Sequence, residues 1–129
     1  MIYLDSCIVI YIVERNPVFG ELAKYALERS GEQAAVSPLV RMECLVKPLK
    51  IRNSDLECDF RAMFRKLQQL PVSEAAFEDA ARIRAEHNLK TPDALHLAIA
   101  KRAGCTALWT NDDRFAKAAP GYAVDIRRL

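Results

Sequence analysis

Four acidic side chains stand beside short apolar runs, where predicted strands end or predicted helices begin. They are Asp5, Glu43, Asp93 and Asp112. Two carboxylates ~4 Å apart repel by about 4 kcal/mol at an effective dielectric near 20, so acids that converge must take up protons or share a cation. Oxygen ligands without Cys or His favour Mg²⁺ or Mn²⁺, which can acidify a bound water and neutralise a phosphodiester. If the four acids meet, they predict metal-dependent hydrolysis.

Each acid also has an ordinary structural explanation. Asp5 could cap the helix that follows it, and Asp93 could complement the dipole at the start of its helix. Glu43 could be a solvated helix position, while Asp112 and Asp113 could be turn residues. A non-enzymatic binding module, with the acids as caps, is therefore an alternative to the enzyme. The elements that position the acids decide between the two.

Short apolar segments predict the strands of the fold. They are residues 2–4, 34–36, 107–110 and 122–126, with residues 70–72 as a further candidate that Pro71 confines to an edge or a strand start. Residues 7–13 are apolar throughout and fit a second strand as well as a buried helix.

Prolines and capping residues mark the first predicted helices. Pro17 is placed to begin a helix that Gly31 ends, and Ser37-Pro38 begin the next one. That second helix is expected to end near Lys47, because Pro48 disfavours a helical residue before it.

The later helices carry similar signals. Ser54-x-x-Glu57 is a capping-box pattern, and the helix after it presents an apolar series of Leu56, Phe60, Met63, Phe64 and Leu67. Ser73 and Glu74 open a helix whose inward residues are predicted to be Phe77, Ala80 and Ala81. Thr91-Pro92-Asp93 begins a helix that runs to Gly104, and residues 111–118 form a turn and a short helix.

Strands that alternate with helices predict crossover connections and a parallel sheet. Residues 1–129 are therefore expected to form one α/β domain, a three-layer α/β/α sandwich with a short parallel sheet of four to five strands. Such sheets bind ligands at the carboxyl ends of their strands. Asp5 and Asp112 directly follow predicted strands, so they are expected at that edge.

Charge and composition narrow the class of protein. The net charge is +2, but residues 41–66 and 101–129 each carry +3 while residues 1–40 and 67–100 each carry −2. A basic rim around an acidic centre would suit an enzyme that acts on a polyanion, although a solvated surface gives the same pattern. No apolar run approaches the ~20 residues of a membrane helix, and no secretory leader is present, so a cytoplasmic location is expected. The four cysteines lack C-x-x-C spacing, which favours reduced thiols over a zinc site.

Taken together, these motifs resemble the PIN domain over essentially the whole chain. They are Asp5-Ser6 after the first strand, Glu43 in the helix after the second, Asp93-Ala-Leu-His-Leu-Ala, and Thr110-Asn-Asp112-x-x-Phe115. The small size is most similar to VapC-type toxins of toxin–antitoxin pairs. The resemblance implies an α/β/α sandwich and an endoribonuclease that depends on Mg²⁺ or Mn²⁺. RNA as substrate, a cognate antitoxin and a homodimer are the implied partners.

The resemblance also assigns roles to residues. It maps the catalytic, metal-binding acids onto Asp5, Glu43, Asp93 and Asp112, and the supporting hydroxyl onto Ser6, with Thr110 beside it. Ser6 stands where Thr is more usual, and Cys7 stands where Asn or Ser is common. Attack by a water in line with the leaving group would produce 5′-phosphate and 3′-hydroxyl ends.

Other side chains near these motifs are candidates for supporting roles. His96 shares a helical face with Asp93 and could bond a site carboxylate, although a packed or capping role is favoured over a catalytic base. Candidate RNA contacts are Arg41, Lys47, Lys50, Arg102 and Arg114, with Arg52 and Lys101 beside them. Such contacts would position RNA without reading its sequence, and ordinary solvated side chains remain the alternative for each.

Three other classes of protein are alternatives to a toxin. A housekeeping PIN nuclease that processes RNA without an antitoxin is the nearest alternative. A phosphotransferring enzyme of the haloacid dehalogenase type would need a second Asp two residues after Asp5, where Cys7 stands. A receiver domain would need a phosphoacceptor Asp after the third strand, where Val72-Ser73 stand.

Overall fold

A short parallel sheet forms the middle of the computed structural model, which describes residues 1–129. Its strands are β1 (Ile2–Leu4), β2 (Ala34–Val36), β3 (Gln68–Gln69), β4 (Ala107–Thr110) and β5 (Ala123–Asp125). The strand order is β3-β2-β1-β4-β5, and every pair is parallel. The sequence-based prediction of a parallel α/β fold is therefore confirmed.

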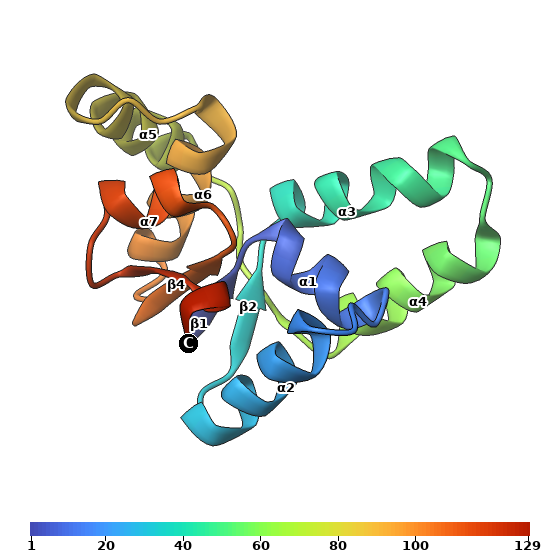
Figure 1. Ribbon diagram of the computed structural model, residues 1–129. Helices are drawn as coiled ribbons and strands as arrows, with labels where there is room; N and C mark the ends of the chain where they lie inside the picture. Colours follow the sequence, from blue (N-terminus) through green and yellow to red (C-terminus); the bar gives the residue numbers. More distant parts are fainter.

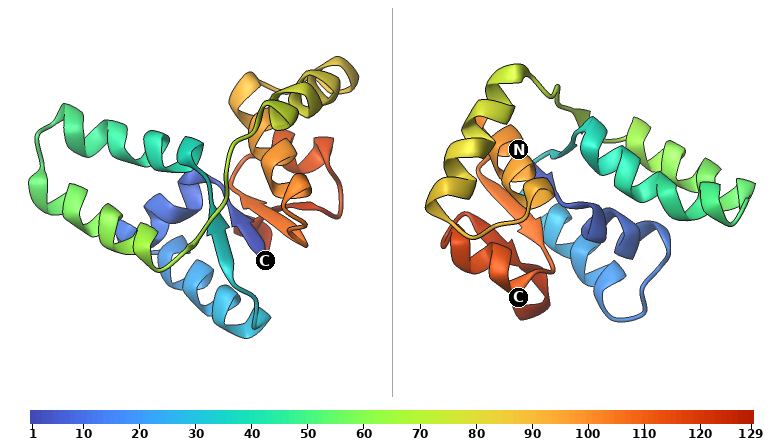
Figure 2. Two further views of the ribbon diagram at one scale, coloured as in Figure 1. Left: turned by 180° about the vertical axis from the view of Figure 1, so that it is seen from behind. Right: turned by 90° about the horizontal axis from the view of Figure 1, so that it is seen from above.

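Seven α-helices cover the two faces of this sheet (Figures 1 and 2). They are α1 (Ser6–Val13), α2 (Phe19–Ser30), α3 (Pro38–Lys50), α4 (Ser54–Arg65), α5 (Glu74–Glu86), α6 (Thr91–Arg102) and α7 (Asp113–Ala118), followed by the 3₁₀ turn η1 (Ile126–Arg128). Helices α1 to α4 lie on one side and α5 to α7 on the other, which gives the three expected layers. No helix is long and apolar enough to cross a membrane.

The central strand β1 sets the position of the functional edge. All three of its residues are buried, as expected of a strand covered on both faces. Tyr3 is in register with Ala35 of β2 and Leu108 of β4. The Asp5 N–H continues the ladder by donating to the Trp109 carbonyl oxygen at 3.0 Å. Asp5 therefore leaves the sheet between the carboxyl ends of its two neighbours.

Residues 7–13, which fit a strand or a helix by sequence, lie in helix α1. Ile8, Val9 and Ile12 are buried, so the i, i+4 repeat faces the core. Val9 and Ile12 are therefore core residues.

Helix α3 extends three residues beyond its predicted end near Lys47. Pro48 lies inside the helix and is buried, and the last residue is Lys50. A proline near the end of a helix removes one backbone hydrogen bond, and burial of its ring offsets part of that loss. The Ile51 N–H still donates to the Lys47 carbonyl oxygen at 3.0 Å, so the final turn closes despite the proline.

The starts of three helices differ from their predicted positions. Helix α2 begins at Phe19 rather than Pro17, because the Asn16 side chain accepts bonds from the first turn at 2.9 and 3.0 Å. Helix α4 is capped by Asn53 rather than Ser54. Lys90, not Thr91, occupies the cap position of α6.

The third strand lies at Gln68–Gln69, just before the predicted residues 70–72. The Leu70 N–H still donates to the Val36 carbonyl oxygen at 2.9 Å, but Pro71 has no N–H to continue the ladder. As predicted, the strand is at an edge of the sheet.

Helix α5 is rotated relative to the prediction. Ala76 and Ala80 face the core, whereas Phe77 is 57% exposed and Ala81 is also exposed. The small residues face α6, which allows these two helices to pack closely. The prediction that Phe77 and Ala81 point inward is wrong for that reason.

Candidate active site

Asp5 occupies the turn between β1 and α1, and it is 8% exposed. Its Oδ1 accepts a hydrogen bond from the Ser6 N–H at 2.7 Å, which caps α1. Its Oδ2 accepts a hydrogen bond at 2.8 Å from the hydroxyl of Thr110, the last residue of the neighbouring strand β4. The Ser6 hydroxyl is more distant, at 3.5 Å from Oδ1. Asp5 is thus both a helix cap and a buried carboxylate at the carboxyl edge of the sheet.

Glu43 reaches the same edge from α3, and His96 reaches it from α6. His96 Nε2 lies 2.7 Å from Glu43 Oε1 and 3.6 Å from Asp5 Oδ1. His96 is fully buried, and its other ring nitrogen, Nδ1, lies 2.6 Å from the Tyr3 hydroxyl. One potential ligand atom from each of Asp5, Glu43 and His96 lies within 4.8 Å of the others.

Asp93 and Asp112 line one hollow of about 180 Å³ beside this group. Asp112 caps α7, with its Oδ1 2.9 Å from the Arg114 N–H. The Asp112 N–H in turn donates to the Thr110 hydroxyl oxygen at 3.1 Å. Thr110 therefore contacts Asp5 through its hydroxyl proton and Asp112 through its oxygen, which joins two acids that are far apart in the chain.

The pKa of the Asp93 carboxyl is affected by its burial and by the neighbouring acids. Burial raises the pKa of its carboxyl to about 6, and the negative charges of Asp5, Asp112 and Glu43 act in the same direction, while His96 opposes them. The other three predicted acids are therefore close enough to act on Asp93. A divalent cation would relieve this repulsion.

The donor set fits a hard cation. The side chains are carboxylates with hydroxyl support, and such oxygen ligands suit Mg²⁺ or Mn²⁺. His96 is the one nitrogen ligand nearby, and both of its ring nitrogens already have hydrogen-bond partners. Carboxylate oxygens have further lone pairs, so the acids can still accept a ligand beside their present hydrogen bonds.

Two neighbouring residues take no part in this cluster. Asp113 forms ion pairs with Lys117 at 2.8 Å and Arg128 at 2.7 Å, so it is a surface charge rather than a spare ligand. Cys7 is partly buried, and burial holds the pKa of its thiol well above the ordinary range. All four cysteines are free, and Cys58 is the exposed one.

The predicted basic residues are spread over several surfaces. Arg114 lines the hollow with Asp93 and Asp112. Lys47 is paired with Glu14 at 2.6 Å, and Lys50 is exposed at the end of α3. Arg102 is paired with Asp79 at 2.6 Å, nine residues after Asp93 and so roughly 14 Å along α6. Of these residues, Arg114 is the one that lies beside the acids.

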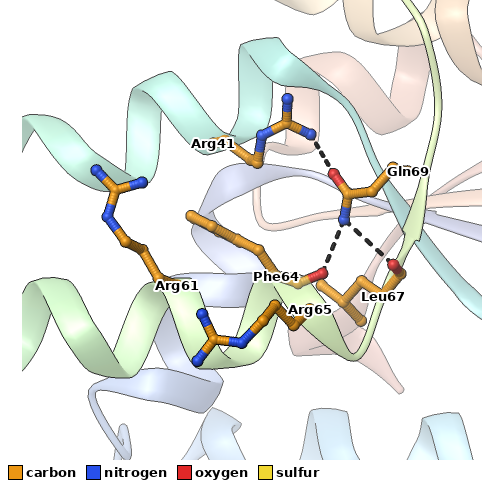
Figure 3. A pocket seen from close by; sticks show the side chains of 6 residues that line it. All are labelled: Arg41, Arg61, Phe64, Arg65, Leu67 and Gln69. Carbon is orange, nitrogen blue, oxygen red and sulfur yellow. Dashed lines mark hydrogen bonds between the residues drawn. The ribbon is translucent and has the colours of Figure 1, made fainter.

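Arg41 belongs to a separate hollow of about 450 Å³ between α3 and α4 (Figure 3). Its guanidinium donates to the Gln69 side-chain oxygen, and Gln69 is held by the Phe64 and Leu67 carbonyl oxygens at 2.8 and 3.1 Å. Arg61 and Arg65 of α4 line the same hollow, and sequence reasoning had not selected them. Glu43 is two positions after Arg41, about 200° around the helix, so the two side chains point to opposite sides of α3.

Comparison with known families identifies the chain. The model of the PIN domain matches residues 2–120. This chain belongs to the PIN domain family. The assignment agrees with the acids at the carboxyl edge of a parallel sheet and confirms the resemblance seen in the sequence.

Solved structures share the whole fold of this PIN domain. A toxin–antitoxin complex from Klebsiella pneumoniae contains a chain with 27% identity and a TM-score of 0.81, with 98% of each chain covered. VapBC2 from Rickettsia felis, bound to promoter DNA, gives 19% identity and a TM-score of 0.80, with 96% of this chain and 98% of that one covered. The toxin VapC20 of Mycobacterium tuberculosis, which cleaves the sarcin-ricin loop, gives 15% identity and a TM-score of 0.76 over 92% of this chain and 95% of that one. No curated protein sequence matches at a significant level.

Proposed function

We propose that this PIN domain is an endoribonuclease that depends on Mg²⁺ or Mn²⁺ and acts as the toxin of a toxin–antitoxin pair. The observation that carries the proposal is the meeting of Asp5, Glu43, Asp93 and Asp112 at one edge of the sheet, with burial and neighbouring charges raising the pKa of Asp93 to about 6. If the four acids were only helix caps in a non-enzymatic binding module, they would have no need to lie close together. Crowding of carboxylates costs stability, and the cost is offset when a cation is bound.

In this proposal, Asp5, Glu43, Asp93 and Asp112 hold the ion and also form the catalytic group. The bound ion would supply charge neutralisation and acidify a water. The protein keeps Asp5 in one orientation through Thr110 and the Ser6 N–H, at 2.8 and 2.7 Å. Arg114, on the rim of the hollow, is placed to donate to a phosphate oxygen of the RNA.

Two comparisons support the toxin reading. The chain from the Klebsiella pneumoniae complex has nearly the same length as this one and shares 27% of its residues, and that structure is a toxin–antitoxin complex. Another neighbour, VapC20, is a toxin that cleaves the sarcin-ricin loop. A cognate antitoxin, an RNA substrate and a homodimer are therefore part of the proposal, together with a cytoplasmic location.

A cleavage assay tests the enzyme. Purified protein should cut RNA in Mg²⁺ or Mn²⁺, leave 5′-phosphate ends, and stop when a chelator is added. Asp93→Asn should reduce the rate at least 100-fold, whereas Asp55→Asn, an exposed acid in the first turn of α4, should not change it. Wild-type rates in a folded Asp93→Asn protein would show that the site is assigned wrongly.

Expression in cells tests the toxin. Induced expression should arrest growth, and co-expression of a neighbouring gene for a DNA-binding antitoxin should restore it. Asp5→Ala should not arrest growth. If the wild-type protein cleaves RNA but leaves growth unaffected, a housekeeping nuclease of the same family becomes the better description.

A further inference from the structure

A line of buried hydrogen bonds runs from the sheet to Glu43. The Ser37 hydroxyl lies 2.7 Å from the Tyr3 hydroxyl, which lies 2.6 Å from His96 Nδ1. His96 Nε2 then lies 2.7 Å from Glu43 Oε1. Tyr3, Ser37 and His96 are each completely buried. Ser37 was expected to cap α3 with its side chain, but its hydroxyl is used in this line instead.

The distances set the direction of the proton at His96. At 2.7 Å from a carboxylate oxygen, Nε2 must carry the hydrogen, because two lone pairs would repel. This holds for a neutral and for a protonated ring. In the neutral ring, Nδ1 accepts from the Tyr3 hydroxyl, and Tyr3 can then accept from Ser37. Burial holds the pKa of Tyr3 above its ordinary range, so the hydroxyl keeps its proton.

Glu43 needs such support more than the other acids. It projects from α3, on the opposite side of the sheet from α6, and a glutamate has three rotatable side-chain bonds to restrain. Its Oε1 is bonded to His96, while no hydrogen bond from the protein reaches Oε2. The bond therefore fixes the carboxylate and leaves one oxygen for another ligand.

We propose that Tyr3 and His96 are positioning residues that orient Glu43 for the cation, with Ser37 anchoring Tyr3. The inference rests on the proposed function, because it concerns the same carboxylates. His96 acts through its hydrogen bond and not as a ligand. Loss of such partners of metal-binding groups typically costs 10- to 100-fold in metal affinity.

Calorimetric titration with Mn²⁺ tests the proposal without any RNA. His96→Asn should weaken Mn²⁺ binding roughly 10- to 100-fold, and Tyr3→Phe about 10-fold. In a separate cleavage assay with RNA, both variants should show a reduced kcat and a KM that is little changed. Tyr122→Phe is a matched control. The Tyr122 hydroxyl donates to the Cys105 carbonyl oxygen at a distance of 2.9 Å, and neither residue belongs to the acid cluster. This control variant should bind Mn²⁺ like the wild type. Nitrogen-15 spectra of the histidine ring should show a proton on Nε2 of His96, and Tyr3→Phe should change the Nδ1 signal.

The outcomes separate the two proposals. If Tyr3→Phe and His96→Asn bind Mn²⁺ as the wild type does, while Asp93→Asn does not, the positioning role is wrong and the metal site stands. If the wild type binds no Mn²⁺, the proposed function fails instead. If His96→Asn does not fold, Tyr3→Phe decides alone, because it removes one oxygen and keeps the ring that packs in the core.

Discussion

The Thr110 hydroxyl donates a 2.8 Å hydrogen bond to Asp5 Oδ2, although 105 positions separate the two residues. The Thr110 hydroxyl oxygen also accepts a hydrogen bond from the Asp112 N–H at 3.1 Å. One buried hydroxyl thus connects the first acid of the cluster to the last. The position of each carboxylate depends on the pairing of β1 with β4, and no local segment could build the site alone.

Replacement of Thr110 should therefore affect both stability and metal binding. Thr110→Val keeps the shape but leaves Asp5 Oδ2 without its donor, which should cost about 1–3 kcal/mol of unfolding free energy and weaken Mn²⁺ binding. Thr110→Ser should retain most of both. Urea unfolding and calorimetry measure the two effects. Equal stability and affinity in Thr110→Val would contradict the role given to this hydroxyl.

Divalent metal should stabilise the folded protein. At 100 times its dissociation constant, Mn²⁺ should add about 2.7 kcal/mol and raise the melting temperature by roughly 10 °C. Asp93→Asn should lose most of this increase. Thermal unfolding with Mn²⁺ and with a chelator provides the comparison, and an identical shift in the variant would mean that the ion binds elsewhere.

The stability of the metal-free protein should depend on pH through Asp93. Its folded-state pKa of about 6 is above the ordinary value of 3.8, mainly because of burial, so folding favours the protonated form. The stabilisation from this proton is complete below about pH 4 and is lost as the pH rises through 6. In the presence of a chelator, the free energy of unfolding of the wild type should therefore fall relative to that of Asp93→Asn between pH 5 and pH 7. If the unfolding free energy of the wild type relative to the variant stays constant or rises with pH, the raised pKa given to Asp93 is wrong.

RNA binding should depend on Arg114 more than on distant basic residues. In an Asp93→Asn background that does not cleave, Arg114→Ala should weaken RNA binding and lower the salt dependence by about 0.7 for one lost phosphate contact. Lys24→Ala, on the exposed surface of α2, removes the same charge and should have little effect. Arg102→Ala tests another of the basic residues selected from the sequence, and it should also have little effect, because Arg102 lies at the far end of α6 and is paired with Asp79 of α5. Fluorescence anisotropy at several salt concentrations measures all three.

Two phenylalanines should respond differently to truncation. Phe60 is completely buried, so Phe60→Ala should destabilise the protein by about 3–5 kcal/mol. Phe77 is 57% exposed, and Phe77→Ala should change stability by about 0.5 kcal/mol or less. Chemical unfolding separates the two, and a large effect at Phe77 would place α5 in the orientation first predicted from the sequence.

Much of the fold and of the acid cluster could be predicted from local signals. Continuous apolar runs give the buried strands at residues 2–4 and 107–110, and the acids directly after them must lie at the carboxyl edge of a parallel sheet. Asp93 was found because it follows a proline in the first turn of an apolar helix. These features depend on one segment at a time.

The remaining features depend on contacts between segments. Nothing in the sequence near Ser37 indicates that its hydroxyl binds Tyr3 instead of capping α3. The orientation of α5 follows from the close packing of its alanines against α6, and periodicity did not select Phe77 as the exposed residue. Arg61 and Arg65 share a hollow with Arg41 only because α3 and α4 pack side by side.

The central place of β1 also has a consequence during synthesis. Strand β1 pairs on one side with β4, whose last residue is Thr110, and the fourth acid follows only at position 112. A nascent chain can form nearby contacts early, but this distant pairing must wait until residues 107–110 have emerged. If the proposed function holds, chains that have not yet reached residue 112 lack the assembled carboxylates and should be inert toward the RNA that surrounds them during translation.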